Sequence, residues 1–391
     1  MIQQPYVIVL ANGLNGLGAV RSAAHAGLRT YTLLTSETDL SAYSRYSQYR
    51  FMLPPAPGID DIRPVLDQLY RNEGGPGVLL ACSDHAAELL GKLKSEGYSH
   101  HYLIVPSAET TELLNDKKLE CRSMEEGGIT LPRTYYELEH VVPEEFPLII
   151  KPRTFREYSV LGAKNVIVNS ISELNEFRQR FQGKLDRFIA QQVIEGNDEN
   201  LWVCNVTFDK NKNLAACFIF NRLGTMPSHY GVTSLAISRE NHVLRQECEK
   251  IGKAINYSGP AMIEFKKDEG SGRYYYIETN PRLGMCNWFD TLCGVNNILA
   301  CSNVAYDKPA LIEQQKNNRV YWNFFGDLIA RLEDRERLVS IVGRYLRLIR
   351  YRRVAALLYW RDPHPALRYS YTAIVDIASR VAQRVRKYRR N

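Results

Sequence analysis

The 391-residue sequence lacks the features of several special classes of protein. It contains no apolar run of the roughly 18–20 residues that a membrane-spanning helix needs, which argues against an integral membrane protein. The N-terminal residues Met1–Tyr6 have neither a basic stretch nor a small-residue cleavage site, so we expect no export signal. With 45% hydrophobic and 24% charged residues, the chain is typical of a globular protein, and its length predicts two or three lobes.

The eight cysteines are scattered and include no Cys-x-x-Cys pair. This spacing favours neither a zinc site nor a disulfide framework. Together with the missing export signal, it predicts reduced thiols and a cytoplasmic protein.

The net charge of +7 is unevenly spread along the chain. Residues 331–391 hold 16 Lys and Arg against 5 Asp and Glu, a net charge of +11. Residues 1–330 hold 34 against 38, a net charge of −4. A uniformly basic nucleic-acid-binding protein would not show this division, so we expect no nucleic-acid partner.

The first part of the sequence alternates apolar strands with helix patterns up to about residue 107, which predicts an α/β domain. A buried strand at Tyr6–Leu10 opens it, followed by a turn, a helix pattern and a second strand at 30–34. This order is typical of a doubly wound parallel sheet.

Two polar segments follow strands of that sheet. Gly13, Gly16 and Gly18 do not have the G-x-G-x-x-G spacing, so we favour a loop that tightens the turn or contacts a substrate over a dinucleotide site. Ser83 and Asp84 follow the strand at 78–82, at the edge where open parallel sheets bind ligands. Capping of the next helix is the alternative for these two residues.

The strongest chemical signal lies in a hairpin with strands at 261–266 and 273–278. Glu278 and Asn280 share a strand face because they are two residues apart, and strand pairing brings Glu264 beside them. Two carboxylates and an amide oxygen suit one or two Mg²⁺ ions that also hold nucleotide phosphates. Arg282, two residues further along the chain, would stabilise negative charge that develops on the reacting groups at this site. The alternative for each glutamate is a simple ion pair.

Three further segments carry groups that suit a nucleotide. Lys151 closes an apolar strand, where its long stem suits a phosphate. Lys117 follows Asp116 at the start of a helix. The strand at 188–193 breaks into a linker whose backbone groups suit an adenine edge. Taken singly, each has a plain alternative: a solvated charge pair, a snorkelling lysine or an edge strand.

Taken in this order, the segments resemble the ATP-grasp superfamily of ATP-dependent carboxylate–amine ligases, from about residue 6 to residue 300. The superfamily patterns "DK…GIP.P", "VVKP" and "E.NPR" are similar to Asp116-Lys117 with Gly128–Pro132, to Ile149–Pro152 and to Glu278–Arg282. The resemblance implies ATP and Mg²⁺ as cofactors.

The resemblance also implies a role for each matching residue. Lys117 and Lys151 would bind ATP phosphates, Gln191, Gln192, Val193 and Ile194 would form the adenine hinge, and Asp198 or Glu199 would bind the ribose hydroxyls. Glu264, Glu278 and Asn280 would hold two Mg²⁺ ions, and Arg282 would stabilise the phosphorylated intermediate.

The sequence departs from the superfamily pattern at two points. The hinge begins with Gln191 where the superfamily usually has Glu. The segment after Lys151 has one glycine, Gly162, where a glycine-rich phosphate lid is expected. Arg153 and Arg156 are the candidates to replace that lid, and the sequence does not rank them.

A segment at 221–232 is similar to a stretch that faces the acyl substrate in the branch containing the D-aspartate-adding enzymes. We therefore expect Arg222 to bind the acyl phosphate or the carboxylate, with a surface salt bridge as the alternative. His229 is a candidate base, and a capping or surface histidine is an equal alternative.

The expected fold class is α/β: an ATP-grasp fold with an N-terminal Rossmann-like pre-ATP-grasp domain and a C-terminal helical basic extension. The expected domains are a Rossmann-like domain (1–112), a small lid subdomain (113–195), a large subdomain (196–325) and the basic extension (326–391). In the extension, helical spacing between Arg331 and Trp360 and a second helix at 371–386 leave two interpretations open. One is an annex docked on the body, and the other is contact with an anionic membrane or polyanion at the inner face of the membrane.

The predicted function is an ATP-dependent ligase that joins a carboxylate to an amine through an acyl phosphate. A substrate carboxylate would find cations in Arg222 and Arg282, and a substrate ammonium would find an acidic group in the Ser83-Asp84 pair. We therefore expect an amino acid as one substrate. The resemblance to D-amino-acid-adding enzymes points to a cell-envelope precursor as acceptor. The alternatives are an ATP-dependent carboxylase of the purine type and a non-catalytic nucleotide-binding scaffold. The sequence leaves a homo-oligomer open.

Overall fold

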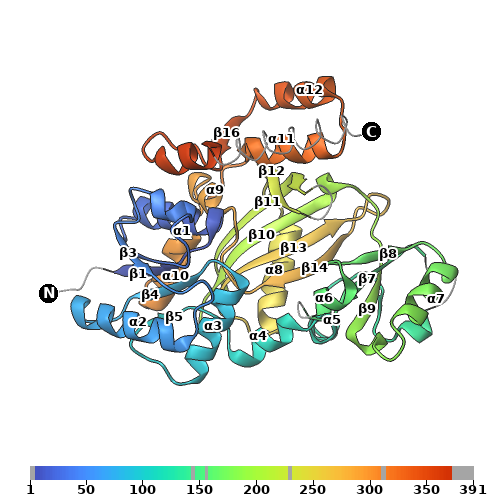
Figure 1. The fold of residues 1–391 in the computed structure, drawn as a ribbon, viewed down its shortest axis with the longest axis horizontal. Coiled ribbons are helices and arrows are strands. Elements are labelled where there is room, and N and C mark those ends of the chain that lie inside the picture. The colour runs from blue at the N-terminus through green and yellow to red at the C-terminus, as the bar shows by residue number, and fades with distance from the viewer. Residues whose placement is uncertain (1–4, 142–145, 155–156, 228–230, 310–313, 372–391) are drawn as a thin grey trace, which may run out of the picture.

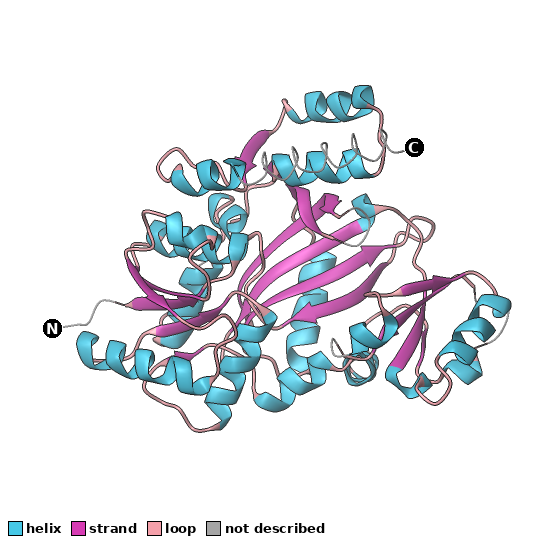
Figure 2. Ribbon diagram, viewed as in Figure 1, coloured by secondary structure: helices cyan, strands magenta, loops and turns pink. Residues whose placement is uncertain are grey.

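The computed structural model describes residues 5–141, 146–154, 157–227, 231–309 and 314–371 (Figure 1). The predictions for Arg156, for His229 and for all but the first residue of the helix at 371–386 lie outside the described residues. Three sheets organise the chain, and Figure 2 shows the long strands of the largest one between the other two.

The N-terminal sheet has five parallel strands in the order β3-β2-β1-β4-β5. The strands are β1 (Tyr6–Leu10), β2 (Arg29–Leu34), β3 (Tyr49–Met52), β4 (Val78–Ala81) and β5 (Tyr102–Leu103). The helices that follow them are α1 (Gly13–His25), α2 (Ile59–Glu73) and α3 (Asp84–Ser95).

Strand β1 is buried on both faces because helices cover both sides of this sheet. Ile8 packs in a cluster with residues of α2 and α3. Its neighbour Val9 packs with residues of α1 and of α10 (Asn297–Ala305), a helix from much later in the chain. The predicted parallel α/β unit is therefore present, and a late helix covers one of its faces.

A four-stranded antiparallel sheet in the order β6-β9-β7-β8 forms the second body. Its elements are β6 (Thr134–Tyr135), β7 (Leu148–Pro152), α6 (Tyr158–Leu161), β8 (Val166–Val168), α7 (Ile171–Arg180) and β9 (Phe188–Gln192). The helices α4 (Ala108–Asn115) and α5 (Lys117–Glu126) lead into it, and α4 spans the predicted domain boundary at residue 112, which stays a prediction.

The largest sheet has seven strands in the order β14-β13-β10-β11-β12-β15-β16. They are β10 (Leu201–Phe208), β11 (Leu214–Met226), β12 (Val232–Ser238), β13 (Gly259–Lys267), β14 (Tyr274–Asn280), β15 (Arg319–Trp322) and β16 (Arg352–Ala355). Helices α4, α5 and α8 (His242–Ala254) contribute to the core on one face, and α9 (Asn287–Leu292) contributes to the core on the other.

The C-terminal segment differs from the helix expected between Arg331 and Trp360. Helix α11 (Phe324–Glu333) and helix α12 (Leu338–Leu348) are followed by β16, which pairs in parallel with β15. The helical prediction is wrong over β16 because this short segment pairs with β15, which also buries Val354 in the core of the sheet. Residues 364–371 are helical again.

A buried ion pair fixes this C-terminal segment to the N-terminal domain. Arg21 of α1 donates from Nε to Asp362 Oδ2 over 2.9 Å, and both side chains are fully buried. Asp362 also accepts from Ser44 Oγ (2.8 Å) and from the backbone N–H of Arg45 (2.9 Å). The part of the extension that contains Asp362 is therefore docked on the body, as one of the two interpretations expected.

All eight cysteines lie in the described part of the chain, and each is buried and unpaired. None of the described helices combines the length and the apolar character needed to cross a bilayer.

Candidate active site

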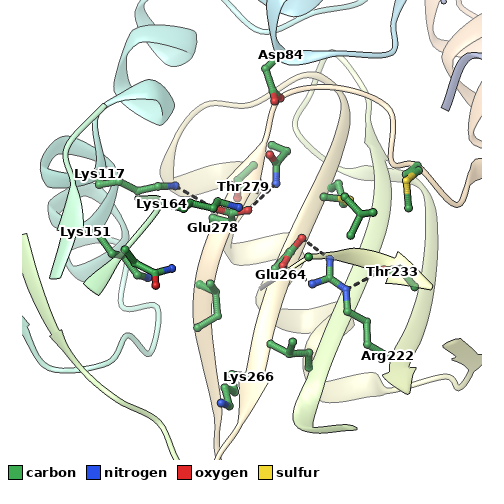
Figure 3. Close-up of a pocket in the computed structure, with 18 of the residues that line it drawn as sticks. Asp84, Lys117, Lys151, Lys164, Arg222, Thr233, Glu264, Lys266, Glu278 and Thr279 are labelled. Atoms are coloured by element: carbon green, nitrogen blue, oxygen red, sulfur yellow. Dashed lines mark hydrogen bonds and ion pairs between the residues drawn. The ribbon is translucent and has the colours of Figure 1, made fainter. Parts of the chain in front are cut away.

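A cleft of about 1230 Å³ opens between the three sheets. Among the residues that the structure describes, all those predicted for ATP, metal or the acyl substrate line it except Glu199. Asp84 and its neighbour Ser83, at the start of α3, line it as well. Figure 3 shows the charged side chains of the large sheet pointing into this space.

The two predicted metal-binding carboxylates lie directly opposite each other on paired strands. Glu264 of β13 is the register partner of Glu278 of β14, and a register irregularity follows Glu264. Asn280 lies two residues beyond Glu278, and its Nδ2 donates to Glu278 Oε1 over 3.2 Å. Like charges at paired positions repel, so cations must lie nearby.

Arg222 of β11 neutralises Glu264 from two strands away. Its guanidinium donates to Glu264 Oε1 over 2.6 Å and to Oε2 over 3.0 Å, a two-pronged contact between two buried side chains. Its Nε donates to Thr233 Oγ1 over 2.9 Å (Figure 3). Burial lowers the pKa of Arg222, but the charge of Glu264 more than offsets it, so the guanidinium stays charged.

Lys117 contacts the other carboxylate. Its Nζ lies 2.9 Å from Glu120 Oε2 and 3.4 Å from Glu278 Oε2. Burial raises the pKa of Glu278, but the charges of Lys117 and Lys164 outweigh burial, so the pKa lies well below its usual range. The same contacts hold the pKa of Lys117 above its usual value, against the effect of burial.

Lys151 approaches the cleft from β7. Its Nζ donates to Gln191 Oε1 over 2.8 Å, and Gln191 is held in turn by a 3.0 Å bond from Nε2 to Thr134 Oγ1. Burial, followed by the charge of Lys117, lowers the pKa of Lys151. Gln191, which departs from the superfamily pattern at the hinge, thus positions Lys151.

The predicted adenine hinge is partly engaged with the protein itself. The backbone N–H of Gln192 donates to Arg133 O over 2.9 Å, and that of Val193 donates to Pro147 O over 3.2 Å. An adenine would therefore have to meet other backbone groups of this stretch.

Of the two candidates for the ribose, Asp198 lines the cleft and accepts a 2.6 Å bond from Thr225 Oγ1. Glu199 does not line it, and its carboxylate lies 3.8 Å from Arg344 of α12. Of these two alternatives from the sequence, only Asp198 therefore lines the cleft.

Arg282 links the large sheet to the N-terminal domain. Its Nε donates to Asp84 Oδ1 over 2.8 Å, and its Nη2 lies 3.3 Å from Asn280 Oδ1. Ser83 caps α3 by accepting from Ala86 N, so the capping alternative is correct for Ser83, whereas Asp84 pairs with Arg282. Arg153, a candidate for the lid, is held by Asp116, the N-cap residue of α5.

Sequence reasoning missed several charged residues at this site, of which Glu120 and Lys164 act on the predicted ones. Glu120 is fully buried and accepts from Lys117 Nζ, Tyr276 OH (2.5 Å) and Thr279 N (3.0 Å), so it fixes Lys117 against β14. Its three-residue spacing from Lys117 was the available signal, because such pairs meet on one helix face. Lys164 lines the cleft, and its positive charge lowers the pKa of Glu278.

The side chains at this site fit a hard divalent cation. Within the described ranges no group of three or more His, Cys, Asp or Glu side chains is arranged to hold a metal ion, so the ligands available at this site are the two carboxylates and an amide oxygen. These are the oxygen donors that Mg²⁺ prefers. In the structure Arg222 contacts Glu264 and Lys117 contacts Glu278, so each of the two opposed carboxylates has a positively charged partner.

Comparisons of sequence point to ATP-binding enzymes. Residues 229–288, the stretch that contains both carboxylates, match the family described as carbamoyl-phosphate synthase L chain, ATP binding domain. The D-aspartate ligase of Enterococcus faecium (strain Aus0004) is 26% identical over 315 residues, which cover 74% of this chain and 74% of that protein.

Solved structures share the fold at low sequence identity. The N5-carboxyaminoimidazole synthetase of Staphylococcus aureus has a TM-score of 0.60 at 15% identity, covering 85% of this chain and 86% of that one. The biotin carboxylase domain of the Hydrogenobacter thermophilus 2-oxoglutarate carboxylase, in complex with MgADP, ADP and bicarbonate, has a TM-score of 0.61 at 17% identity. That likeness covers 82% of this chain and 74% of that one.

Proposed function

The chain belongs to the ATP-grasp superfamily, and from this premise we propose that it is an ADP-forming ligase that joins a carboxylate to an amine. One observation carries the proposal. A single cleft gathers Lys117, Lys151, Arg222 and Arg282 around the opposed carboxylates Glu264 and Glu278. Such a gathering of charges of both signs suits the transfer of a phosphoryl group between anionic reactants.

The proposed reaction has two steps. A carboxylate oxygen attacks the γ-phosphorus of ATP, the bond to the β-phosphate oxygen breaks, and ADP leaves an acyl phosphate behind. An amine then attacks the carbonyl carbon, phosphate leaves with that carboxylate oxygen, and the amine gives up a proton to form the amide. Splitting the condensation in this way replaces one difficult step with two easier ones.

We assign the residues of the cleft as follows. Lys117 and Lys151 hold the phosphates of ATP, the backbone at 191–194 meets the adenine, and Asp198 meets the ribose. Glu264, Glu278 and Asn280 would hold Mg²⁺, which supplies charge neutralisation on the phosphoryl group when bound. Arg222 and Arg282 face the acyl phosphate.

For one substrate we propose an amino acid. Arg282 and Asp84 are paired at 2.8 Å at the cleft, and the Asp84 side chain is largely exposed. A zwitterion is complementary to such a pair, with its carboxylate toward Arg282 and its ammonium toward Asp84. The name of the D-aspartate ligase supports this class, and a cell-envelope precursor as acceptor is the corresponding proposal for the second substrate. We place the protein in the cytoplasm, which the eight unpaired cysteines support.

A phosphate-release screen tests the proposed function. Amino acids and other small acids are offered in pairs with amines, together with ATP and Mg²⁺, and products are identified by mass spectrometry. We expect ADP and phosphate to form only when an acid and an amine are both present. Formation of ADP with bicarbonate and an amine alone would contradict the ligase and support the carboxylase, and AMP as product would contradict both.

A further inference from the structure

Helix α12 exposes a stripe of apolar side chains to solvent. Leu338, Val342, Leu346 and Ile349 recur at intervals of three or four residues, and Val339 lies beside them on the same side of the helix. Between 54% and 83% of each of these side chains is exposed. Contiguous exposed apolar side chains of this kind mark a surface that interacts with something else.

The other flank of α12 already holds the helix on the protein. Ile341 and Leu348 are buried, and the ring of Tyr345 lies 4.8 Å from that of Trp322. Tyr345 OH also donates to the buried Asp327 over 2.8 Å. The exposed stripe is therefore not needed to keep α12 in place, and its apolar character calls for a separate explanation.

The charge along and after the stripe is positive. Residues 337–361 contain no Asp or Glu, whereas Glu333, Asp334 and Glu336 lie just before this segment. The exposed arginines of the segment are Arg337, Arg347, Arg350, Arg352 and Arg353, together with Arg361. Trp360, with 76% of its surface exposed, lies 4.7 Å from the guanidinium of Arg361. Figure 1 shows α12, β16 and α11 along one edge of the molecule.

We propose that the α12 stripe and its flanking arginines dock on an anionic lipid surface, a property beyond the proposed ligase activity. Apolar side chains between arginines suit the boundary between acyl chains and anionic headgroups. A second copy fits less well. A twofold contact through this stripe would bring the Arg347 and Arg350 side chains of both copies together, with no acid in 337–361 to pair them.

Vesicle sedimentation of the full chain tests the proposal. We expect binding to vesicles of phosphatidylcholine with phosphatidylglycerol, little binding to phosphatidylcholine alone, and weaker binding as salt is raised. Replacing Arg347 and Arg350 together by Gln should weaken binding about 25-fold, because each arginine near an anionic surface contributes roughly five-fold.

A matched pair of variants separates docking from general effects of a new charge. Val342 of the stripe and Val243 of α8 are 54% and 53% exposed. V342D should weaken vesicle binding about ten-fold or more, and V243D should bind like the unchanged chain, with equal thermal unfolding temperatures for both.

Three results would overturn the proposal. They are absence of binding by the full chain, equal binding to neutral and anionic vesicles, and equal loss of binding in V342D and V243D. A change of oligomeric state in V342D without vesicle binding would assign the stripe to a second copy instead. None of these readouts depends on ligase turnover, so failure here and failure of the proposed function are distinguishable.

Discussion

The Glu278→Gln variant should lose about two orders of magnitude or more in ATP turnover while it keeps its fold. The substitution removes one negative charge and preserves the shape of the side chain. Glu278 lies opposite Glu264 and 3.4 Å from Lys117, so its charge contributes to any cation held between the two strands. The concentration of Mg²⁺ needed for half-maximal turnover should rise as well.

The fold should survive because the partners of Glu278 keep other contacts. Lys117 retains the buried Glu120 at 2.9 Å, and Glu264 retains Arg222. Because the charges of Lys117 and Lys164 hold the pKa of Glu278 below its usual range, the charged carboxylate contributes to stability, and we expect a modestly lower unfolding temperature with the fold retained.

Glu269→Gln is the matched control for this prediction. Glu269 lies in the turn that joins β13 to β14, and its side chain is exposed. The Glu269→Gln substitution makes the same chemical change on the same hairpin but away from the cleft, so it should leave turnover unchanged. Turnover in Glu278→Gln equal to that of the control would show that the carboxylate has no part in the reaction.

The Asp362→Asn variant should lose about 3–5 kcal/mol of unfolding free energy, because it leaves Arg21 charged and buried without its partner. Asp362 accepts from Arg21, Ser44 and the N–H of Arg45, and all of these contacts join the C-terminal segment to the N-terminal domain. Urea unfolding followed by circular dichroism measures the loss.

An exposed ion pair supplies the comparison. Arg63 and Glu96 lie 2.6 Å apart with 37% and 49% of their side chains exposed. Glu96→Gln should cost less than about 1 kcal/mol. A similarly small loss in Asp362→Asn would mean that the charge of Asp362 contributes little to holding the C-terminal segment on the N-terminal domain.

Much of the fold was predictable because its signals are local. The ATP-grasp fold expected from the motifs is confirmed, and β1, β4 and the β13–β14 hairpin lie close to where apolar runs and turn residues placed them. Strand β16 was missed because its first two residues are Arg352 and Arg353, and only its place beside β15 makes it a strand. Strand β3 was missed as well, because it is a four-residue strand at the edge of its sheet with mostly exposed side chains.

The site was predictable in its members but not in its contacts. Local motifs selected Lys117, Lys151 and Glu278, and the structure brings them to one cleft. The contact between Arg222 and Glu264 spans two strands of the sheet, so it depends on strand order, which local sequence does not contain. Gln191 was expected in the adenine hinge, which stays a prediction, and the contact of its side chain with Lys151 was not predicted.

The most direct test of the account follows an oxygen atom from the acid to the phosphate. With the acid and amine found in the screen, the carboxylate is labelled with ¹⁸O and the products are examined by mass spectrometry. An acyl phosphate requires one labelled oxygen to leave the acid with the phosphate when the amine attacks. The account therefore predicts phosphate that carries one ¹⁸O atom and ADP that carries none. Unlabelled phosphate, or label in AMP, would contradict it.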